Sequence, residues 1–288
     1  MSNPSRRSLA GSVDWHLVLL YLLLVLSRLP VYDLYGIKLI SLFADVCLAA
    51  AVAQLAGMTT RRSGVILLSF LSALLAPTVV INSGLWGQCD AVYTAFALWG
   101  LVLGLKDRPV LSVMAFACAF SFKLQAVFIL PILLFLLVKG KLRMRHLIAF
   151  PATFLVIMLP ALLAGRSLSD TFGIYLDQTR AYRYLSLNAP SVWALIPNDY
   201  FAALDPAPVL MAGIGALLLA YAFLPRHRTL GARELISLAL LFSLAIPWLL
   251  PRMHERYFYM AEVLSIPYAA QRLRNLPVAV ILLAGLLL

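Results

Sequence analysis

Residues 61–90 read RRSGVILLSFLSALLAPTVVINSGLWGQCD, and they contain the pattern that decides the fold. Two arginines precede about 20 largely apolar residues, the length that an α-helix needs to cross the hydrocarbon core of a bilayer. A polar cluster follows the apolar run. The stretch therefore predicts a membrane-spanning helix over 63–82, with a basic loop at one end and a polar cluster at the other.

The rest of the chain repeats this pattern. Of its 288 residues, 63% are hydrophobic and 12% are charged, whereas a soluble domain carries about 25% charged residues. The predicted fold class is all-α: a single polytopic transmembrane bundle over 1–288 with about 10–11 spans and a non-cytoplasmic loop at 166–206. Further apolar runs predict spans at 15–30, 37–57, 89–105, 109–122, 124–138, 146–164, 208–224, 234–250, 256–271 and 276–288.

The basic residues predict the orientation. The formal net charge of +11 would suggest nucleic acid as a partner of a soluble protein, but here Lys and Arg sit in short loops between apolar runs, so no nucleic-acid partner is expected. With the N-terminus in the cytoplasm, most basic residues lie at cytoplasmic ends, in agreement with the positive-inside rule. They include Arg61, Arg62, Lys106, Arg108, the run Lys139–Arg145, Arg233, Arg272 and Arg274.

The N-terminus and the cysteines call for no special chemistry. Arg6 and Arg7 precede an apolar run that fits a signal peptide or a retained helix, and the lack of a small-residue cleavage site favours the helix. Cys47, Cys89 and Cys118 show neither metal nor disulfide spacing. We interpret them as packing residues and predict no metal site, while the residues leave open whether a divalent metal takes part.

This topology places three polar clusters on the same, non-cytoplasmic side: Asn82–Asp90, Asn188–Trp193 and Pro251–Tyr257. Lys123 and Gln125 interrupt a long apolar stretch in the same half of the bilayer. Ionisable residues at membrane depth are costly, so they usually pair or line a functional cavity. We therefore expect these segments to contribute to one site.

The third cluster suits an anion. Arginine binds phosphate through two parallel hydrogen bonds, so Arg252 and Arg256 are candidate phosphate ligands, and His254 adds a donor or a proton. Glu255 would orient one of these cations, and Tyr257 begins the aromatic run beside them. The same residues would also serve as interfacial anchors, because Arg and Tyr gather at headgroup level.

Lys123 has two interpretations. Its side chain either reaches along the helix to the interface or faces the bundle interior and meets an anion. Gln125 lies two residues further on and cannot share the helical face of Lys123. An unwound segment would suit both side chains better, and broken helices at membrane depth are tolerated where they line a cavity.

Asp90 is the acidic candidate of the first cluster. It falls in the first turn of the predicted helix 89–105, where the helix dipole favours negative charge. The same carboxylate could stand at a cavity rim and bind sugar hydroxyls, a metal or a cation. Trp86 would offer an apolar face to a sugar or an isoprenoid, and Gln88 and Asn188 are supporting amide side chains.

Taken together, these segments resemble the membrane glycosyltransferases of the C superfamily. More narrowly, they are similar to the bacterial relatives of the second mannosyltransferase of GPI-anchor synthesis. The resemblance covers residues from about 15 to 275, and order and spacing carry it rather than any one motif. It rests on Asn82–Asp90, on Phe122–Ala126 with Pro131, on Leu187–Pro190 with Trp193, and on Pro251–Tyr257.

The resemblance implies an enzyme of the outer face of a bacterial plasma membrane. Such an enzyme transfers a hexose, typically mannose, with inversion from a polyprenyl-phosphate sugar to a glycan, lipid or protein acceptor. By this resemblance Lys123, Arg252, His254 and Arg256 would hold the phosphate of the donor. The implied partners are membrane lipid, the lipid-linked donor and the acceptor, and no further cofactor is assigned.

One part of the family pattern is missing. Members resemble one another in a long first outer loop with an acidic residue that acts as the general base, whereas Asp33 is the sole acid between the first two predicted spans. The chain is therefore expected to be a truncated form, and whether it catalyses transfer by itself is left open. Asp90 is the candidate base that remains, although the resemblance does not assign it that role.

Two other functions fit the residues. A transporter or flippase for a lipid-linked or anionic solute would also use polar residues and broken helices, although such folds often contain internal repeats. The chain shows no convincing repeat and its clusters lie near one face, which favours the enzyme. The third hypothesis is a structural membrane subunit whose polar clusters are interfacial anchors.

Overall fold

The computed structural model describes residues 33–180, 184–197 and 230–285, together with a few residues between 210 and 218. This part of the protein is helical apart from two short strands, β1 (Ser186–Leu187) and β2 (Met253–His254), which pair in parallel. The all-α prediction is therefore confirmed for the described residues. The predicted span 15–30, with Arg6 and Arg7 before it, and most of the predicted span 208–224 lie outside them.

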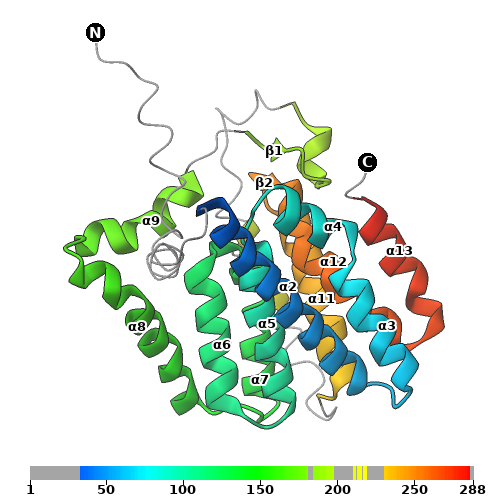
Figure 1. Cartoon of the computed structure of the whole chain (residues 1–288). Helices are drawn as coiled ribbons and strands as arrows, with labels where there is room; N and C mark the ends of the chain where they lie inside the picture. Colours follow the sequence, from blue (N-terminus) through cyan, green and yellow to red (C-terminus); the bar gives the residue numbers. More distant parts are fainter. Residues whose placement is uncertain are drawn as a thin grey trace.

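The helices follow the predicted apolar runs closely (Figure 1). Short π-helical or 3₁₀ turns connect several of them: η3 (Val80–Leu85), η4 (Leu124–Phe128), η5 (Met144–Ile148), η6 (Val192–Leu195), η8 (Glu255–Phe258) and η9 (Leu273–Asn275). The α-helices are α2 (Asp33–Gly57), α3 (Ser63–Leu74), α4 (Pro77–Val79), α5 (Asp90–Leu105), α6 (Pro109–Phe122), α7 (Pro131–Val138), α8 (Ala149–Leu163), α9 (Leu168–Arg180), α11 (Ala232–Leu249), α12 (Tyr259–Gln271) and α13 (Leu276–Gly285).

Prolines mark where several helices start. Pro77, Pro109 and Pro131 occupy the first helical position of α4, α6 and α7. Proline has no backbone N–H and its ring holds φ near the helical value, so the first helical position accepts it without losing a helical hydrogen bond. The apolar stretch that begins at Ser63 is therefore interrupted at Pro77, just before the segment that carries the first polar cluster.

Four helical segments of the described chain are long and apolar enough to cross a membrane, judged by length and composition. They match the predicted spans 37–57, 63–82, 146–164 and 234–250. Four shorter apolar helices cover 90–105, 109–122, 124–138 and 273–285. This composition indicates a membrane protein, while the number of crossings and their direction stay predictions.

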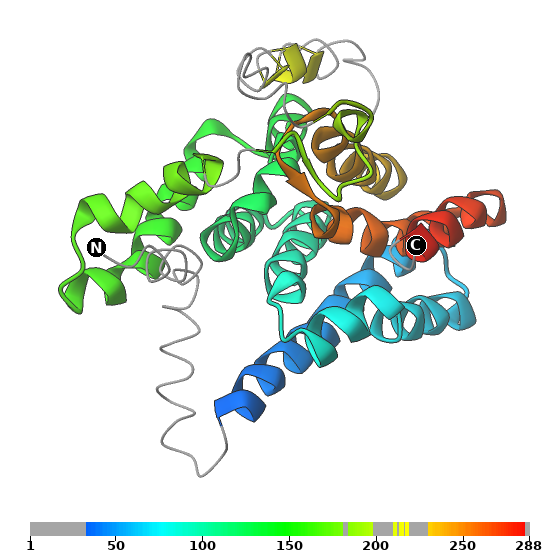
Figure 2. The same ribbon diagram turned by 90° about the horizontal axis from the view of Figure 1, so that it is seen from above.

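Helix α5 is the centre of the bundle. It packs against α2 on one side and α6 on the other, and most of its side chains are buried. The α5–α6 approach is close because Gly100 has no side chain: a Cβ there would lie 2.9 Å from the Phe116 ring. The Ser112 hydroxyl also donates to the Gly100 carbonyl oxygen across 2.7 Å. Viewed from above, α8 and α9 lie on one side of this centre and α3 and α13 on the other (Figure 2).

The predicted loop 166–206 is partly helical. It contains α9, β1 and η6, and its residues 198–206 lie outside the described part. Helix α9 is held to the bundle by Tyr175, whose hydroxyl donates to the Ser121 carbonyl oxygen across 3.1 Å. The Tyr175 ring also stacks on Phe120, with 5.3 Å between the ring centroids. This loop therefore packs on the end of α6.

Candidate functional site

The interruption expected at Lys123 and Gln125 is present. Helix α6 ends at Phe122, Lys123 is extended with φ −155° and ψ 129°, and the turn η4 follows before α7 begins at Pro131. The extended residue lets the Lys123 side chain leave the helix axis and enter the bundle. Its side chain is only 12% exposed, so it does not reach along the helix to an interface.

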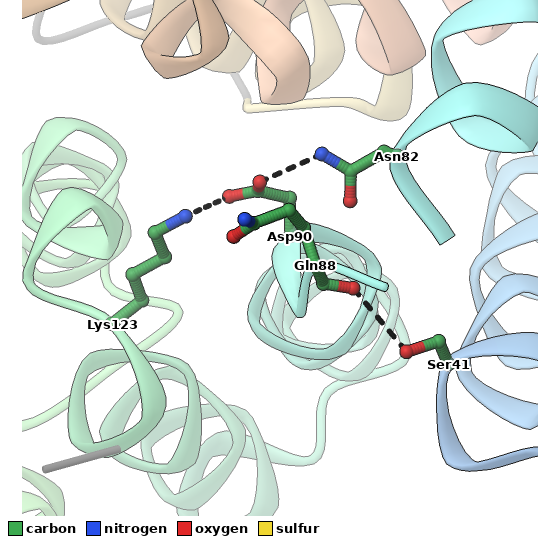
Figure 3. A network of polar contacts seen from close by, with 5 residues as sticks. All are labelled: Ser41, Asn82, Gln88, Asp90 and Lys123. Atoms are coloured by element: carbon green, nitrogen blue, oxygen red, sulfur yellow. Dashed lines mark hydrogen bonds and ion pairs between the residues drawn. The ribbon is translucent and has the colours of Figure 1, made fainter. Parts of the chain in front are cut away.

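The Lys123 ammonium group pairs with the Asp90 carboxylate (Figure 3). Asp90 is fully buried, and its other oxygen, Oδ2, accepts a hydrogen bond from Asn82 Nδ2 across 2.8 Å. Lys123 Nζ also lies 5.5 Å from the centroid of the Tyr93 ring. Asp90 and Lys123, both predicted as site residues from separate motifs, thus form one ion pair in the interior.

A tight turn places Asp90 at the start of α5, as expected. Gly87 has φ +62°, a conformation that residues with a Cβ rarely adopt. The backbone N–H of Gln88 then donates to the Asn82 carbonyl oxygen across 2.9 Å, and the Gln88 carbonyl oxygen accepts from Ser41 Oγ across 3.3 Å (Figure 3). Gln88 thus contributes through its main chain to the turn that brings Asn82 and Asp90 together.

The irregular segment 77–85 donates to three buried carboxylates from three different helices. Thr78 donates to Glu262 of α12, Asn82 to Asp90 of α5, and Ser83 Oγ to Asp45 Oδ1 of α2 across 2.8 Å. These three carboxylates are at most 3% exposed. Since a buried charge is costly unless it is paired or hydrogen-bonded, this segment supports the polar interior of the whole bundle end.

Asp45 and Glu262 were not among the predicted site residues. The sequence pattern that could have indicated them is an acid inside an otherwise apolar span: Asp45 in 37–57 and Glu262 in 256–271. Tyr259 of α12 is a further buried polar side chain: it is 1% exposed, and its hydroxyl has no hydrogen-bond partner among the described residues. The polar interior is therefore larger than the sequence motifs indicated.

The second and third polar clusters meet through the β1–β2 pair. Leu187 lies opposite His254 in the parallel register, and Asn188 forms an additional bridge with His254. The backbone N–H of Arg252, a residue with φ +65°, donates to the Leu185 carbonyl oxygen across 2.8 Å. The expected juxtaposition of Asn188 with the histidine cluster is thus present in the backbone pairing.

The third cluster also contacts the broken segment. His254 Nδ1 lies 3.1 Å from Glu255 Oε2, an arrangement that agrees with Glu255 orienting a cation. The His254 ring packs edge-on against Tyr257 at 5.8 Å, and Tyr257 in turn lies 6.3 Å from Phe128 of η4, measured between ring centroids. Aromatic rings therefore connect the histidine to the turn that follows Lys123.

Arg256 is the second residue of η8, directly after the contact between His254 and Glu255. Arg256 Nε is buried and has no hydrogen-bond partner among the described residues. Two acceptor atoms of the other polar segments, Asn82 Oδ1 and Gln125 Oε1, are also buried and have no hydrogen-bond partner among the described residues.

The remaining candidates lie at the rim. Trp86 is 53% exposed, Asn188 is exposed, and Gln88 is half-buried. Trp193 donates from Nε1 to the Leu249 carbonyl oxygen at the end of α11 across 2.8 Å, which ties the loop 184–197 to the bundle. Among the residues that the structure describes, no group of three or more His, Cys, Asp or Glu side chains is arranged to hold a metal ion.

The geometry separates a buried ion pair from the basic third cluster. Asp90 is fully buried with both oxygens engaged, so in this arrangement it holds Lys123 in place and does not face an acceptor hydroxyl. In the segment that carries the third cluster, His254 contacts Glu255 and Tyr257, and Arg256 has a buried Nε without a hydrogen-bond partner among the described residues. Comparison of the chain with protein-family models, curated proteins and solved structures finds no match.

Proposed function

We propose that the protein binds the phosphate of a polyprenyl-phosphate sugar at this end of the bundle and transfers its hexose, typically mannose, to an acceptor at the non-cytoplasmic face. The resemblance of the four sequence segments supports this function. The observation that carries it is the Arg256 guanidinium, whose Nε is buried and has no hydrogen-bond partner among the described residues.

A donor phosphate would complete this cluster. Arg256 would donate to its oxygens, and His254 and Arg252 would add charge or a proton from β2 and the residue before it. As the bond between sugar carbon and phosphate oxygen breaks, negative charge grows on the phosphate. Fixed cations in a partly buried site stabilise that charge without reorganising, which lowers the barrier to transfer.

Asp90 would control the availability of Lys123. In the described arrangement the carboxylate holds the ammonium group, so Asp90 acts as a positioning residue. A donor phosphate would compete for Lys123 and release one Asp90 oxygen. Only then would Asp90 be able to take the proton of an acceptor hydroxyl as its oxygen bonds to the sugar carbon and the phosphate leaves.

A transporter is the second candidate, and one observation favours it. Asp45, Asp90 and Glu262 are buried carboxylates on three helices, all hydrogen-bonded to an irregular segment that contains a π-helical turn. Broken helices and intramembrane acids are typical of ion-coupled transporters. In that case the acids, rather than the cations near His254, would be essential to activity.

The test is equilibrium binding of radiolabelled polyprenyl-phosphate mannose to the purified chain in detergent micelles. Arg256→Gln should weaken binding by about tenfold or more, the loss expected for one charge-assisted hydrogen bond to phosphate. Arg145→Gln is the matched control, since Arg145 is exposed on η5 and the same charge is removed.

If Arg256→Gln and Arg145→Gln weaken donor binding equally, the loss is explained by the change in net charge, and this result counts against a phosphate site at Arg256. Unchanged binding in the Arg256 variant would exclude the proposal outright. Transport and transfer are then separated in vesicles: release of free polyprenyl phosphate from the donor supports transfer. Movement of intact donor between leaflets, lost in Glu262→Gln, supports the transporter.

A further inference from the structure

A second polar region lies at the opposite end of the bundle. It is a pocket of about 460 Å³ between the end of α7, the first turns of α11, the end of α12 and η9. In Figure 1 the start of α11 lies at the lower end and β2 at the upper end. Helix α11 has 18 residues and measures about 27 Å, close to the thickness of a hydrocarbon core. The pocket therefore opens toward the start of α11, whereas β2 follows the other end of this helix.

The lining of this pocket is strongly basic. Its charged side chains are Lys139, Arg233, Arg272, Arg274 and one carboxylate, Glu234, so the lining carries a net charge of +3. No carboxylate of the described chain lies within ion-pair distance of any of the three arginines. The Arg233 guanidinium donates to the Thr59 carbonyl oxygen across 3.5 Å, and no carboxylate of the described chain neutralises the charge of the three arginines.

Hydrogen bonds hold the arginine-bearing segments together. Gln271 Nε2 of α12 donates to the Arg233 carbonyl oxygen of α11 across 3.4 Å. Asn275 Nδ2 of η9 donates to the Tyr268 carbonyl oxygen across 3.0 Å, which folds η9 back onto α12. The backbone that carries Arg233, Arg272 and Arg274 is thus arranged before any ligand binds, which lowers the ordering cost of binding.

The pocket has an apolar wall beside its cations. Phe135 and Leu238 line it from the buried side, and Leu241, which is 49% exposed, extends the apolar surface one turn further along α11. A free anion needs only the arginines. A phosphate that is attached to acyl chains would use both surfaces, because its headgroup meets the cations at the level where its chains meet Leu241.

We infer that this basic pocket binds a phosphate-bearing anion, and that an anionic phospholipid of the predicted cytoplasmic leaflet supplies it. All four basic residues were predicted from the sequence to lie at cytoplasmic ends of their spans. The lipid would bridge α7, α11 and η9 through its phosphate and stabilise this end of the bundle. The inference does not depend on the function proposed for the opposite end.

Native mass spectrometry of the purified 288-residue chain tests the inference with phosphatidylglycerol and phosphatidylcholine as probes. Phosphatidylglycerol should bind more tightly than phosphatidylcholine. The double variant Arg233→Gln/Arg272→Gln should weaken phosphatidylglycerol binding by about 25-fold, since each arginine near the headgroup contributes about fivefold. Glu234→Gln should have the opposite sign and strengthen binding, because it removes the one carboxylate of the lining.

Arg145→Gln is the control for net charge, since Arg145 is exposed on η5 and does not line the pocket. Inorganic phosphate is added at an ionic strength matched with sodium chloride. Displacement of the lipid by phosphate but not by chloride supports the phosphate as the recognised group. Binding of inorganic phosphate to the lipid-free protein that is as tight as binding of phosphatidylglycerol would overturn the lipid as the natural source.

Phosphatidylglycerol binding that is unchanged in a correctly folded double variant, or equal for the two lipids, overturns the inference. If the double variant does not fold, two single variants replace it. Arg274→Gln, at an exposed residue, should weaken phosphatidylglycerol binding, and Glu234→Gln should strengthen it. Unchanged binding in both variants overturns the inference. Arg256→Gln should leave phosphatidylglycerol binding intact, and the pocket variants should leave binding of polyprenyl-phosphate mannose intact. The experiments therefore test the two proposals independently, and one can fail while the other stands.

Discussion

The charged side chains at the two ends of the bundle differ in their burial and in their pairing. Near Asp90 the charged groups are buried, and each carboxylate accepts a hydrogen bond from segment 77–85. Around Arg233 and Arg274 the charges are exposed and have no carboxylate partner within the described chain. Removing one partner of a buried ion pair lowers the free energy of unfolding strongly, whereas an exposed charge contributes little to stability and can bind a ligand. The ends should therefore respond differently to substitution.

The largest effect is expected from Lys123→Met. It leaves the fully buried Asp90 carboxylate without its cation and should lower the free energy of unfolding by about 3–5 kcal/mol, measured by denaturant titration in mixed micelles. The double variant Lys123→Met/Asp90→Asn removes both charges and should recover most of the loss. A single variant as stable as the parent would mean that the Asp90 environment is not charged, and the comparison of the two ends would fail.

The next effect concerns the donors of segment 77–85. Ser83→Ala removes the hydrogen bond to Asp45 and should cost about 1–3 kcal/mol of unfolding free energy, because a buried carboxylate loses its donor. Ser237→Ala is the matched control at the pocket end, where the hydroxyl donates to the carbonyl oxygen of Arg233 one turn earlier across 2.8 Å. Its cost should stay within about 0.5 kcal/mol. Equal losses would contradict the distinction.

A smaller effect is expected where the loop 184–197 joins the bundle. Trp193→Phe keeps the ring but removes the Nε1 donor to the Leu249 carbonyl oxygen, so the free energy of unfolding should fall by about 1 kcal/mol. Trp86→Phe serves as the reference, since Trp86 is 53% exposed. The same titration measures both, and a Trp193 variant that matches the reference would show that this bond does not anchor the loop.

The smallest effect on stability is expected at the pocket. Arg274→Gln changes an exposed side chain on η9 and should shift the free energy of unfolding by no more than about 0.5 kcal/mol in lipid-free micelles. Added phosphatidylglycerol should stabilise the parent more than this variant, because the lipid binds only the folded state. A stability loss near that of Lys123→Met without lipid would mean that the two ends do not differ.

Several parts of this arrangement were predictable from local sequence. Apolar run lengths predicted most helix bounds, and Lys123 and Gln125 indicated the interruption after Phe122. The positive-inside pattern also predicted that Lys139, Arg233, Arg272 and Arg274 share one end of the bundle, and they line one pocket. Such features depend on residues adjacent in the chain or on a rule that applies to every span separately.

The partners of the buried charges were not predictable in this way. Asp45 and Glu262 are single acids within apolar spans, and nothing local indicates that Ser83 and Thr78 would reach them from a distant segment. Likewise, the motifs separately indicated Asp90 as a site carboxylate and Lys123 as a cation, but the sequence did not indicate that each would be the other's partner. Pairings between segments depend on how the helices pack.

The sequence by itself determined a helical, apolar chain with its polar residues gathered into a few segments, and it predicted most basic residues at one set of span ends. These properties follow from composition, helix length and the cost of placing charge in lipid. The tertiary structure alone decided which polar residues pair with one another, as Asp90 and Lys123 do, and which line a pocket together, as Arg233 and Arg274 do. Electrostatic pairing acts over a few ångströms in space, and only packing brings those atoms that close.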